Sequence, residues 1–270
     1  MKTKISLSGE METLLIPLYG RAESTRRGLC SDPYAIETVE KIEYDFNALK
    51  IPKKTRVLMA LRSMIFDDLA RDFLGNNPGA TVQSLGSGLD ARYARVQGYG
   101  VWVDLDFPEV AAQREELLPA LSGHRNLASS VTDKAWLDQV PATGAKTLVI
   151  CEGLTLYLQD EELRDHFKRI TARFPDVCLA FDAYSLLTAR RAGRIPGLKN
   201  TGATIRWGVD DPKSLEHGYG PIKHVNTLYM TDRRYTAALD PLYGLMFRAA
   251  AAFPAAREAH RVLVYTSTDQ

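Results

Sequence analysis

The chain has 270 residues, of which 45% are hydrophobic and 25% charged, with 19 glycines and 13 prolines. This composition is typical of a globular protein with a sizeable core, and it excludes disorder, collagen and coiled coil. The 34 Lys and Arg residues against 33 Asp and Glu give a formal net charge of +1. Because so small a charge supplies no field for a polyphosphate backbone, we do not expect nucleic acid as a partner.

The cysteines and the apolar runs limit the setting of the protein. Cys30, Cys151 and Cys178 lie far apart with no C-x-x-C spacing, which predicts reduced thiols and no metal site. No stretch reaches 18 uninterrupted apolar residues, and no apolar signal segment follows Lys2 and Lys4. We therefore expect a cytoplasmic protein that does not use a membrane.

The first 75 residues are predicted to be mostly helical. Apolar residues recur at spacings of three and four over Ile36–Leu49 and Thr55–Leu74, and Asn76-Asn77-Pro78-Gly79 closes the second helix. Residues 1–75 are therefore expected to form an N-terminal helical cap.

From residue 76 onward, short apolar runs alternate with helical stretches. The predicted strands are Thr81–Leu85, Gly100–Leu105, Leu127–Ser129, Thr147–Cys151 and Val177–Phe181. The predicted helices between them are Asp90–Gln97, Glu109–Leu118, Lys134–Val140 and Asp160–Phe174. This alternation indicates right-handed βαβ units and a parallel sheet, whose ligands bind beyond the carboxyl ends of the strands.

The alternation stops after Phe181. Residues 185–208 are rich in Arg, Gly and Thr without a clear period, and their length favours either local structure or a functional lid over a structureless loop. A strand at Ile222–Met230, helical material over Asp232–Phe253 and a final strand at Arg261–Thr266 follow. This order is compatible with an antiparallel strand at the edge of the sheet.

A glycine turn follows the first predicted strand, at Ser84-Leu85-Gly86-Ser87-Gly88-Leu89-Asp90. Glycine lets the backbone turn tightly and approach a ligand closely, beside a helix N-terminus that favours polar groups. Taken alone, such a turn is also compatible with a mere strand-to-helix connection.

An acidic pair, Asp104 and Asp106, ends the second predicted strand about 20 residues after the glycines. A carboxylate at that place can accept hydrogen bonds from the hydroxyls of a ribose, which indicates a nucleoside-bearing cofactor. The alternative is that these aspartates cap the helix that begins at Pro108.

Two cofactors fit these features. Gly86, Gly88 and Ala91 satisfy the G-x-G-x-x-A form of an NAD site, whereas a shorter glycine turn suits S-adenosylmethionine (SAM). The fourth strand ends in Glu152-Gly153, and a carboxylate there can bind the ammonium of an amino acid, which SAM has and NAD lacks. A helix-capping role for Glu152 is the alternative.

Six segments in order resemble the leucine carboxyl methyltransferase superfamily, and within it the bacterial O-methyltransferases of polyketide biosynthesis. They are Thr13–Ala22, Asp32-Pro33, Arg62 with Phe66-Asp67, Leu85–Arg92 (L-G-x-G-L-D-x-R), Val103–Val110 and Glu152–Leu158 (E-G-x-x-x-Y-L). The resemblance implies an α/β fold of the class I SAM methyltransferases, with a Rossmann-like seven-stranded sheet whose last strand is antiparallel. The core would span residues 76–270, with the lid inserted at about 185–208.

The resemblance also implies cofactor contacts. Arg62 would hold the SAM carboxylate, Gly86 and Gly88 would pass under the methionine part, Asp106 would bind the ribose, and Glu152 would lie near the amino-acid end. The full set of cofactor-binding residues is expected to be Arg62, Gly86, Ser87, Gly88, Asp106, Ser130, Val131, Glu152 and Gly153. The chain has Ser129-Ser130 where the family commonly has Asp-Leu, so either Ser130 or Asp133 would address the adenine amino group.

The expected function is SAM-dependent methylation of a carboxylate or hydroxyl of a small molecule, with S-adenosylhomocysteine (SAH) as the product. A carboxylate acceptor is ionised at neutral pH and needs no general base, so the lack of an evident base does not count against an enzyme. Arg21 and Tyr157 are expected to face the acceptor. An NAD-dependent oxidoreductase and a non-catalytic nucleoside sensor remain the alternatives.

Overall fold

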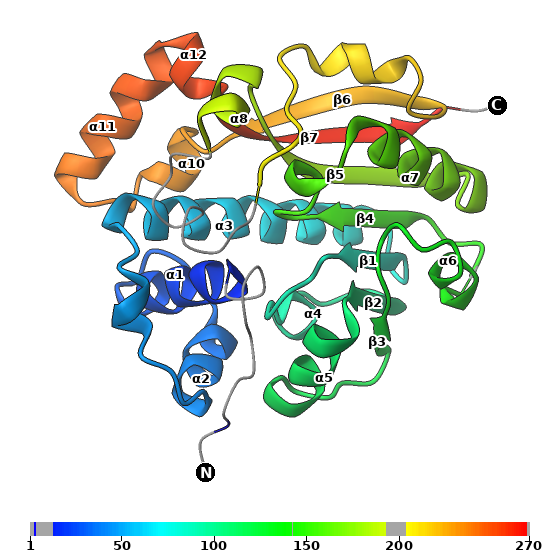
Figure 1. The fold of residues 1–270 in the computed structure, drawn as a ribbon, viewed down its shortest axis with the longest axis horizontal. Coiled ribbons are helices and arrows are strands. Elements are labelled where there is room, and N and C mark those ends of the chain that lie inside the picture. Colours follow the sequence, from blue (N-terminus) through cyan, green and yellow to red (C-terminus); the bar gives the residue numbers. More distant parts are fainter. Residues whose placement is uncertain (1–2, 4–12, 142, 193–203, 269–270) are drawn as a thin grey trace.

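The computed structural model describes residue 3 and residues 13–141, 143–192 and 204–268. Its centre is a seven-stranded sheet in the order β3-β2-β1-β4-β5-β7-β6 (Figure 1). The strands are β1(Thr81–Leu85), β2(Val101–Asp106), β3(His124–Ala128), β4(Thr147–Cys151), β5(Val177–Tyr184), β6(Ile222–Tyr229) and β7(His260–Ser267). β1 to β5 pair in parallel, and β7 lies antiparallel between β5 and β6. The predicted α/β sheet with an antiparallel last strand is confirmed.

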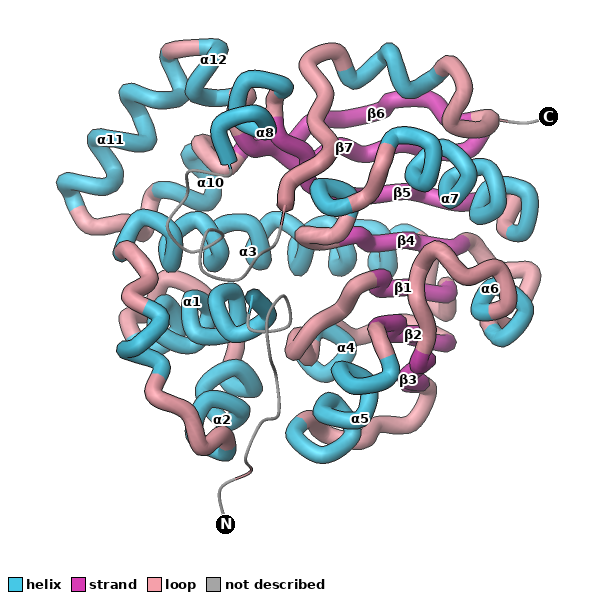
Figure 2. The backbone as a smooth tube through the Cα atoms, in the orientation of Figure 1, coloured by secondary structure: helices cyan, strands magenta, loops and turns pink. Residues whose placement is uncertain are grey.

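Helices surround this sheet. The α-helices are α1(Leu15–Arg26), α2(Pro33–Lys41), α3(Lys53–Asn76), α4(Arg92–Arg95), α5(Pro108–Leu117), α6(Trp136–Gln139), α7(Asp160–Arg173), α8(Leu186–Ala192), α10(Arg233–Thr236), α11(Pro241–Ala252) and α12(Pro254–Arg257). Three short 3₁₀ helices are η2(Phe46–Leu49), η3(Thr155–Tyr157) and η4(Pro212–Glu216). α3 crosses one face of the sheet while α7 lies over the other (Figure 2).

α3 belongs to the same hydrophobic core as the sheet. Leu61 and Ile65 on the helix and Val82 and Ile150 on the strands are all fully buried in one cluster. Their positions on α3 follow the period of three and four seen in the sequence, which places one apolar stripe against the strands. The boundary at residue 75 stays a prediction, and the long helix before it packs directly on β1 and β4.

Several predicted element boundaries differ from the structure. The helix predicted over Ile36–Leu49 is two elements, because α2 ends at Lys41, Ile42 is extended, and the Asp45 side chain caps η2 instead. The predicted helix at Asp90–Gln97 is only the single turn α4. The helical material at 232–253 is divided into α10 and α11, because Asp240 starts a new helix by accepting a hydrogen bond from the Tyr243 N–H.

The strands also begin or end at other residues than predicted. β3 starts at His124, earlier than predicted, and β5 continues to Tyr184 because it pairs with β7 along its whole length. The predicted lid begins with α8, and its residues 193–203 lie outside the described part of the chain. Within the described residues, no helix has both the length and the apolar character that a bilayer span requires.

The second face of the sheet buries a histidine. His166 on α7 is 1% exposed, packs between Trp136 and Phe167, and neither ring nitrogen has a hydrogen-bond partner in the described structure. Burial lowers the pKa of His166 to about 4 because the charged imidazolium cannot be solvated there.

This histidine predicts a pH dependence of stability. In the unfolded chain the imidazole pKa is about 6.5, so the unfolded state binds more protons between pH 6.5 and 4. The free energy of unfolding should therefore fall as the pH falls through this window, by up to about 3 kcal/mol from this group. His166→Phe should remove that contribution. Urea unfolding of both proteins at pH 7 and pH 4.5 checks it, and an equal loss in the two proteins would contradict it.

Candidate cofactor site

The glycine turn at the end of β1 is closely surrounded by side chains. Gly86 and Gly88 have φ angles of +65° and +51°, which favour glycine. A Cβ on Gly86 would lie 3.1 Å from Leu154 Cδ1, and one on Gly88 would lie 3.1 Å from Leu14 Cδ2. The turn therefore sits between the residue before η3 and the residue before α1.

Asp106, at the end of β2, faces this turn. Its Oδ2 accepts a hydrogen bond from the Gly88 N–H at 2.7 Å, and its Oδ1 accepts one from the Phe107 N–H at 2.8 Å. Burial raises the pKa of Asp106, and these two donors only partly offset the effect. No side chain among the described residues forms an ion pair with Asp106, but the charge of the nearby Arg114 also lowers the pKa of this buried carboxyl group.

Asp104, two residues earlier on the same strand, has a different environment. Its carboxylate accepts hydrogen bonds from Trp102 Nε1, from Arg114 Nη2 and from His124 Nε2. Arg114 in turn donates to the Gly88 carbonyl at 2.6 Å. Asp104 thus holds the Arg114 side chain that bonds to the Gly88 carbonyl, whereas Asp106 bonds directly to the Gly88 N–H.

Arg62 on α3 joins two strand ends. Its Nε donates to Glu152 Oε1 at 2.9 Å, after β4, and its Nη1 donates to Asp182 Oδ2 at 3.0 Å, on β5. In the described part of the chain, Nη2 makes no hydrogen bond. The guanidinium therefore links Glu152 and Asp182, and its role toward a cofactor stays a prediction.

Gly153 makes room for this guanidinium. A Cβ at position 153 would lie 3.1 Å from Arg62 Nη1 and 3.3 Å from Nη2, and the residue has φ +70°. The Gly153 N–H donates to Asp182 Oδ1 at 2.6 Å, while His260 Nε2 lies 2.8 Å from Asp182 Oδ2. Burial alone would raise the pKa of Asp182, but Arg62 and His260 bring it well below its usual range.

The ion pairs continue from Glu152 toward the N-terminal helices. Arg92 Nη2 donates to Glu152 Oε2 at 2.6 Å, and Arg92 Nε donates to Asp67 Oδ1 at 2.7 Å. Arg95 then donates to Asp67 Oδ2 at 2.7 Å and to Asp90 Oδ1 at 2.6 Å. A single connected chain of buried charges thus runs from β5 to α4.

Arg21 ends this chain on α1. Its Nε donates to Asp32 Oδ2 at 2.8 Å and its Nη2 donates to the Leu89 carbonyl at 3.0 Å, while Asp90 Oδ1 lies 4.0 Å away. Arg21, which is predicted to face the methyl acceptor, is therefore only 4% exposed and is held in contacts within the protein. Its role toward an acceptor stays a prediction.

The predicted adenine loop follows β3. The Ser129 N–H donates to the Asp106 carbonyl at 2.9 Å, which places this loop beside the end of β2. Ser130 Oγ lies 2.8 Å from Thr132 Oγ1, and Asp133 is exposed with its Oδ1 accepting from the Ala135 N–H. Val131 is buried, and its carbonyl accepts a hydrogen bond from Trp136 Nε1 at 3.2 Å.

The predicted lid returns to the site at Arg206. The N–H groups of Arg206 and Trp207 both donate to the Leu156 carbonyl, at 2.8 and 3.3 Å. Leu156 belongs to η3, next to Tyr157, so the segment after residue 203 lies directly against the turn that follows Gly153. Tyr157 therefore stands where the cofactor loop meets the end of the lid.

With this geometry established, we compared the chain with known proteins. Residues 16–171 match the model of the leucine carboxyl methyltransferase family. The tetracenomycin polyketide synthesis O-methyltransferase TcmP of Streptomyces glaucescens is 34% identical, with 98% of this chain and 100% of that protein covered.

The chain belongs to the leucine carboxyl methyltransferase family. An S-adenosyl-L-methionine-dependent methyltransferase of Gibberella zeae, dpfgK, is 30% identical, with 85% of each chain covered. The structure of magnesium protoporphyrin IX methyltransferase from Synechocystis with bound SAM matches the fold with a TM-score of 0.51, at 13% identity and 98% coverage of this chain. The protein is a SAM-dependent methyltransferase of class I fold, which decides against the NAD-dependent and non-catalytic alternatives.

Sequence reasoning missed three members of the charge chain. Asp182 was read only as the residue after a hydrophobic strand, although a lone acid inside Val-Cys-Leu-Ala-Phe-Asp-Ala-Tyr is a signal of a buried pair. The sequence presents Arg92 only as part of a motif, and Arg95, one helical turn away, has no signal of its own. Their role depends on α4 turning both guanidinium groups toward Asp67, which no spacing rule predicts.

Asp182 predicts a strong effect on stability. Asp182→Asn keeps the shape but leaves the Arg62 charge half compensated in a buried site, which typically costs about 3 to 5 kcal/mol. Asp176→Asn, at an exposed acid just before the same strand that is 3.7 Å from Lys146, is the matched control and should change stability by less than about 1 kcal/mol. Denaturant unfolding compares them, and equal effects would show that the buried pair adds nothing.

Proposed function

We propose that the protein transfers the methyl group of SAM to an oxygen, either a carboxylate or a hydroxyl, of a small molecule. The observation that carries the proposal is the convergence of Arg62, Glu152 and Asp106 at adjacent carboxyl ends of β1, β2 and β4. Arg62 offers a positive charge for the carboxylate of an amino acid, and Glu152 offers a negative charge for its ammonium group. Asp106, at the same edge of the sheet, offers a carboxylate for the hydroxyls of a ribose.

The residues at this edge fit SAM chemically. The free Nη2 of Arg62 suits the cofactor carboxylate, Glu152 suits its ammonium group, and Asp106 suits the ribose hydroxyls. Ser87 adds a buried hydroxyl that has no hydrogen-bond partner in the described structure. Gly86, Gly88 and Gly153 leave the space between these groups without side chains, and Ser130 and Val131 would border the adenine.

The negative charge of Asp106 also suits this cofactor. SAM carries one net positive charge, because its sulfonium and ammonium outweigh its carboxylate. Asp106 is a buried carboxylate with no ion-pair partner among the described residues, and burial raises its pKa although the Gly88 and Phe107 N–H groups and the charge of Arg114 partly offset the effect. A positively charged cofactor placed nearby would stabilise its ionised form.

Oxygen is the acceptor that fits this chain best. SAM supplies a methyl group whose sulfur leaves as a neutral thioether, so the protein chiefly has to align the acceptor oxygen with it and exclude water. An ionised carboxylate needs no base, whereas a hydroxyl is helped by one. The polyketide O-methyltransferase similar over the whole chain supports a small-molecule oxygen acceptor.

The acceptor side is assigned to the segments that cover the strand ends. Leu14 before α1 and Leu154 before η3 lie against the glycine turn, and the lid end at Arg206 bonds to Leu156, next to Tyr157. Arg21 would act there by holding Asp90 and the Leu89 carbonyl in place, with its charge directed toward the covered space.

The two aspartates of β2 provide a matched test of the cofactor site. Asp106→Ala should weaken SAH binding by roughly 10- to 150-fold, the value of a lost charge-assisted hydrogen bond, with little loss of stability. Asp104→Ala should instead lower the free energy of unfolding, because it leaves Arg114 buried and unpaired, and should affect SAH affinity less. Calorimetry with SAH and urea unfolding of both variants check this, and a reversed pattern would contradict the assignment.

The acceptor atom is tested by product analysis. We expect methyl-labelled SAM and aromatic hydroxy acids to give labelled esters or ethers in the presence of the protein. Alkaline hydrolysis then distinguishes the two, because it releases labelled methanol from esters only. Methylation confined to nitrogen or carbon across a panel of amines, enols, acids and phenols would contradict an oxygen acceptor.

A further inference from the structure

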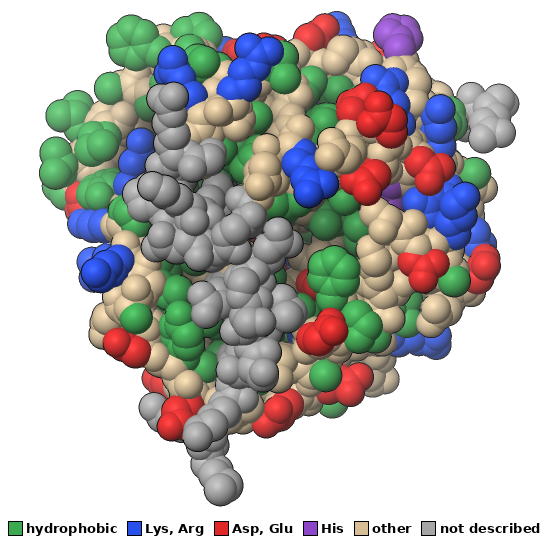
Figure 3. All heavy atoms as spheres, viewed as in Figure 1, with side chains coloured by type: hydrophobic (Ala, Val, Ile, Leu, Met, Phe, Trp, Pro, Cys, Tyr) green, Lys and Arg blue, Asp and Glu red, His purple; other side chains and the backbone are tan. Residues whose placement is uncertain are grey.

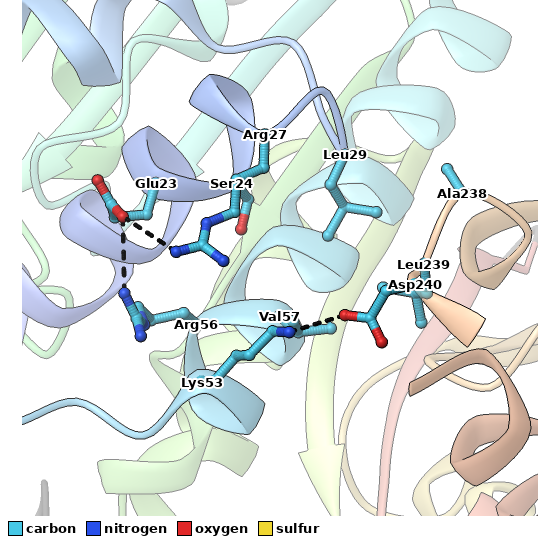
Figure 4. A pocket seen from close by; sticks show the side chains of 10 residues that line it. All are labelled: Glu23, Ser24, Arg27, Leu29, Lys53, Arg56, Val57, Ala238, Leu239 and Asp240. Atoms are coloured by element: carbon cyan, nitrogen blue, oxygen red, sulfur yellow. Dashed lines mark hydrogen bonds and ion pairs between the residues drawn. The ribbon is translucent and has the colours of Figure 1, made fainter. Parts of the chain in front are cut away.

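A cavity lies away from the carboxyl ends of the strands, between α1, the start of α3 and the connection from α10 to α11. It has a volume of about 320 Å³ (Figure 4). The lining residues are Glu23, Ser24, Arg27, Leu29, Lys53, Arg56, Val57, Ala238, Leu239 and Asp240. This size is at the lower end of the usual range of ~300 to 1,000 Å³ for small-molecule sites.

The cavity has an apolar floor and a charged rim. Leu29, Val57 and Leu239 supply the apolar surface, and Figure 4 shows charged side chains from α1 and α3 around it. A ligand that fits must therefore have both an apolar body and a charged end.

The two arginines on the rim are incompletely satisfied. Arg56 Nη1 and Arg27 Nη2 lie 3.6 and 3.8 Å from the same oxygen, Glu23 Oε2, too far for hydrogen bonds. The other oxygen, Glu23 Oε1, accepts a hydrogen bond from Arg26 at 3.2 Å. Arg56 Nε is buried without any hydrogen-bond partner in the described structure. Arg27, whose side chain is 58% exposed, and Arg56 thus bring to one cavity two guanidinium groups that make no hydrogen bond to Glu23, and such a pair is a recognition element for a planar oxyanion.

The rim carries a net positive charge. Lys53 donates to Asp240 Oδ2 at 2.7 Å, so this pair is internally balanced. The remaining charged residues are Arg27 and Arg56 against Glu23, which also serves Arg26. The excess corresponds to a monoanion.

We propose that this cavity binds a small organic carboxylate, with its carboxylate on Arg27 and Arg56 and its apolar body on Leu29, Val57 and Leu239. The proposal goes beyond the methyl-transfer function and does not depend on it. Arg62 follows Arg56 by six residues on α3, about 9 Å along the helix axis, so the two guanidinium groups serve different sites.

The test uses 2-naphthoate as the probe and calorimetry on the full chain saturated with SAH. We expect Arg27→Met with Arg56→Met to weaken naphthoate binding at least about tenfold. Arg26→Met is the matched control, since Arg26 binds the same glutamate without lining the cavity, and it should retain the affinity. Neutral 2-naphthylmethanol and inorganic phosphate should both bind at least tenfold more weakly than naphthoate.

A variant that binds naphthoate more tightly cannot owe its changed affinity to misfolding. Asp240→Asn keeps a residue that caps α11 well but removes a negative charge from the rim, so naphthoate should bind a few-fold tighter. Naphthoate affinity that is absent in the native chain, or unchanged by both the double arginine variant and Asp240→Asn, would overturn the proposal. Binding that competes with SAH or disappears in Arg62→Ala alone would place the probe in the methyl-transfer site and would also overturn it.

Discussion

The structure depends on one chain of buried ion pairs that links the N-terminal helices to the sheet. Its members share low exposure and contact one another through side-chain oxygens and nitrogens. In order they are Asp32, Arg21, Asp90, Arg95, Asp67, Arg92, Glu152, Arg62 and Asp182. Breaking one buried pair leaves a charge without its partner in a poorly solvated site, so each member constrains the position of the next.

This chain of charges explains why the helices before the sheet belong to the site. α3 contributes Arg62 and Asp67, and α1 contributes Arg21, so the glycine turn after β1 is fixed by elements up to 70 residues away in the sequence. Four arginines face five carboxylates, leaving out His260. The excess negative charge is suited to a cofactor with one net positive charge, and in our proposal the cofactor as a whole, with its sulfonium, completes the balance.

Much of this arrangement follows from the sequence. The positions of the strands along the chain come from short apolar runs separated by helices. The seven-stranded sheet with its antiparallel last strand, and the choice of Asp106 over Asp104, come only from the resemblance to known methyltransferases. The alternation of side chains along a strand cannot rank two aspartates that share one face, because the partners of Asp104 come from α5 and β3. Arg114 and His124 carry no local signal of that contact.

The features that the sequence does not predict all depend on tertiary contacts. Extended backbone at Ile42 divides a helix that the apolar period predicts as continuous, and the Phe46 ring of the following 3₁₀ helix packs against Tyr19. Asp182 lies in an otherwise apolar strand, and only the arrival of Arg62 from α3 makes its burial favourable. Local periodicity predicts which face is buried, but it does not predict which distant cation will meet a buried acid.

The central claim is that Arg62 couples Glu152 and Asp182 into one cofactor-binding unit. A double-mutant cycle on SAH affinity, using Glu152→Gln, Asp182→Asn and the double variant, measures that coupling most directly. Because both acids hold the same guanidinium, we predict a coupling free energy of at least about 1 kcal/mol. Effects that add to within about 0.5 kcal/mol would show that the two acids act independently, and would contradict the account.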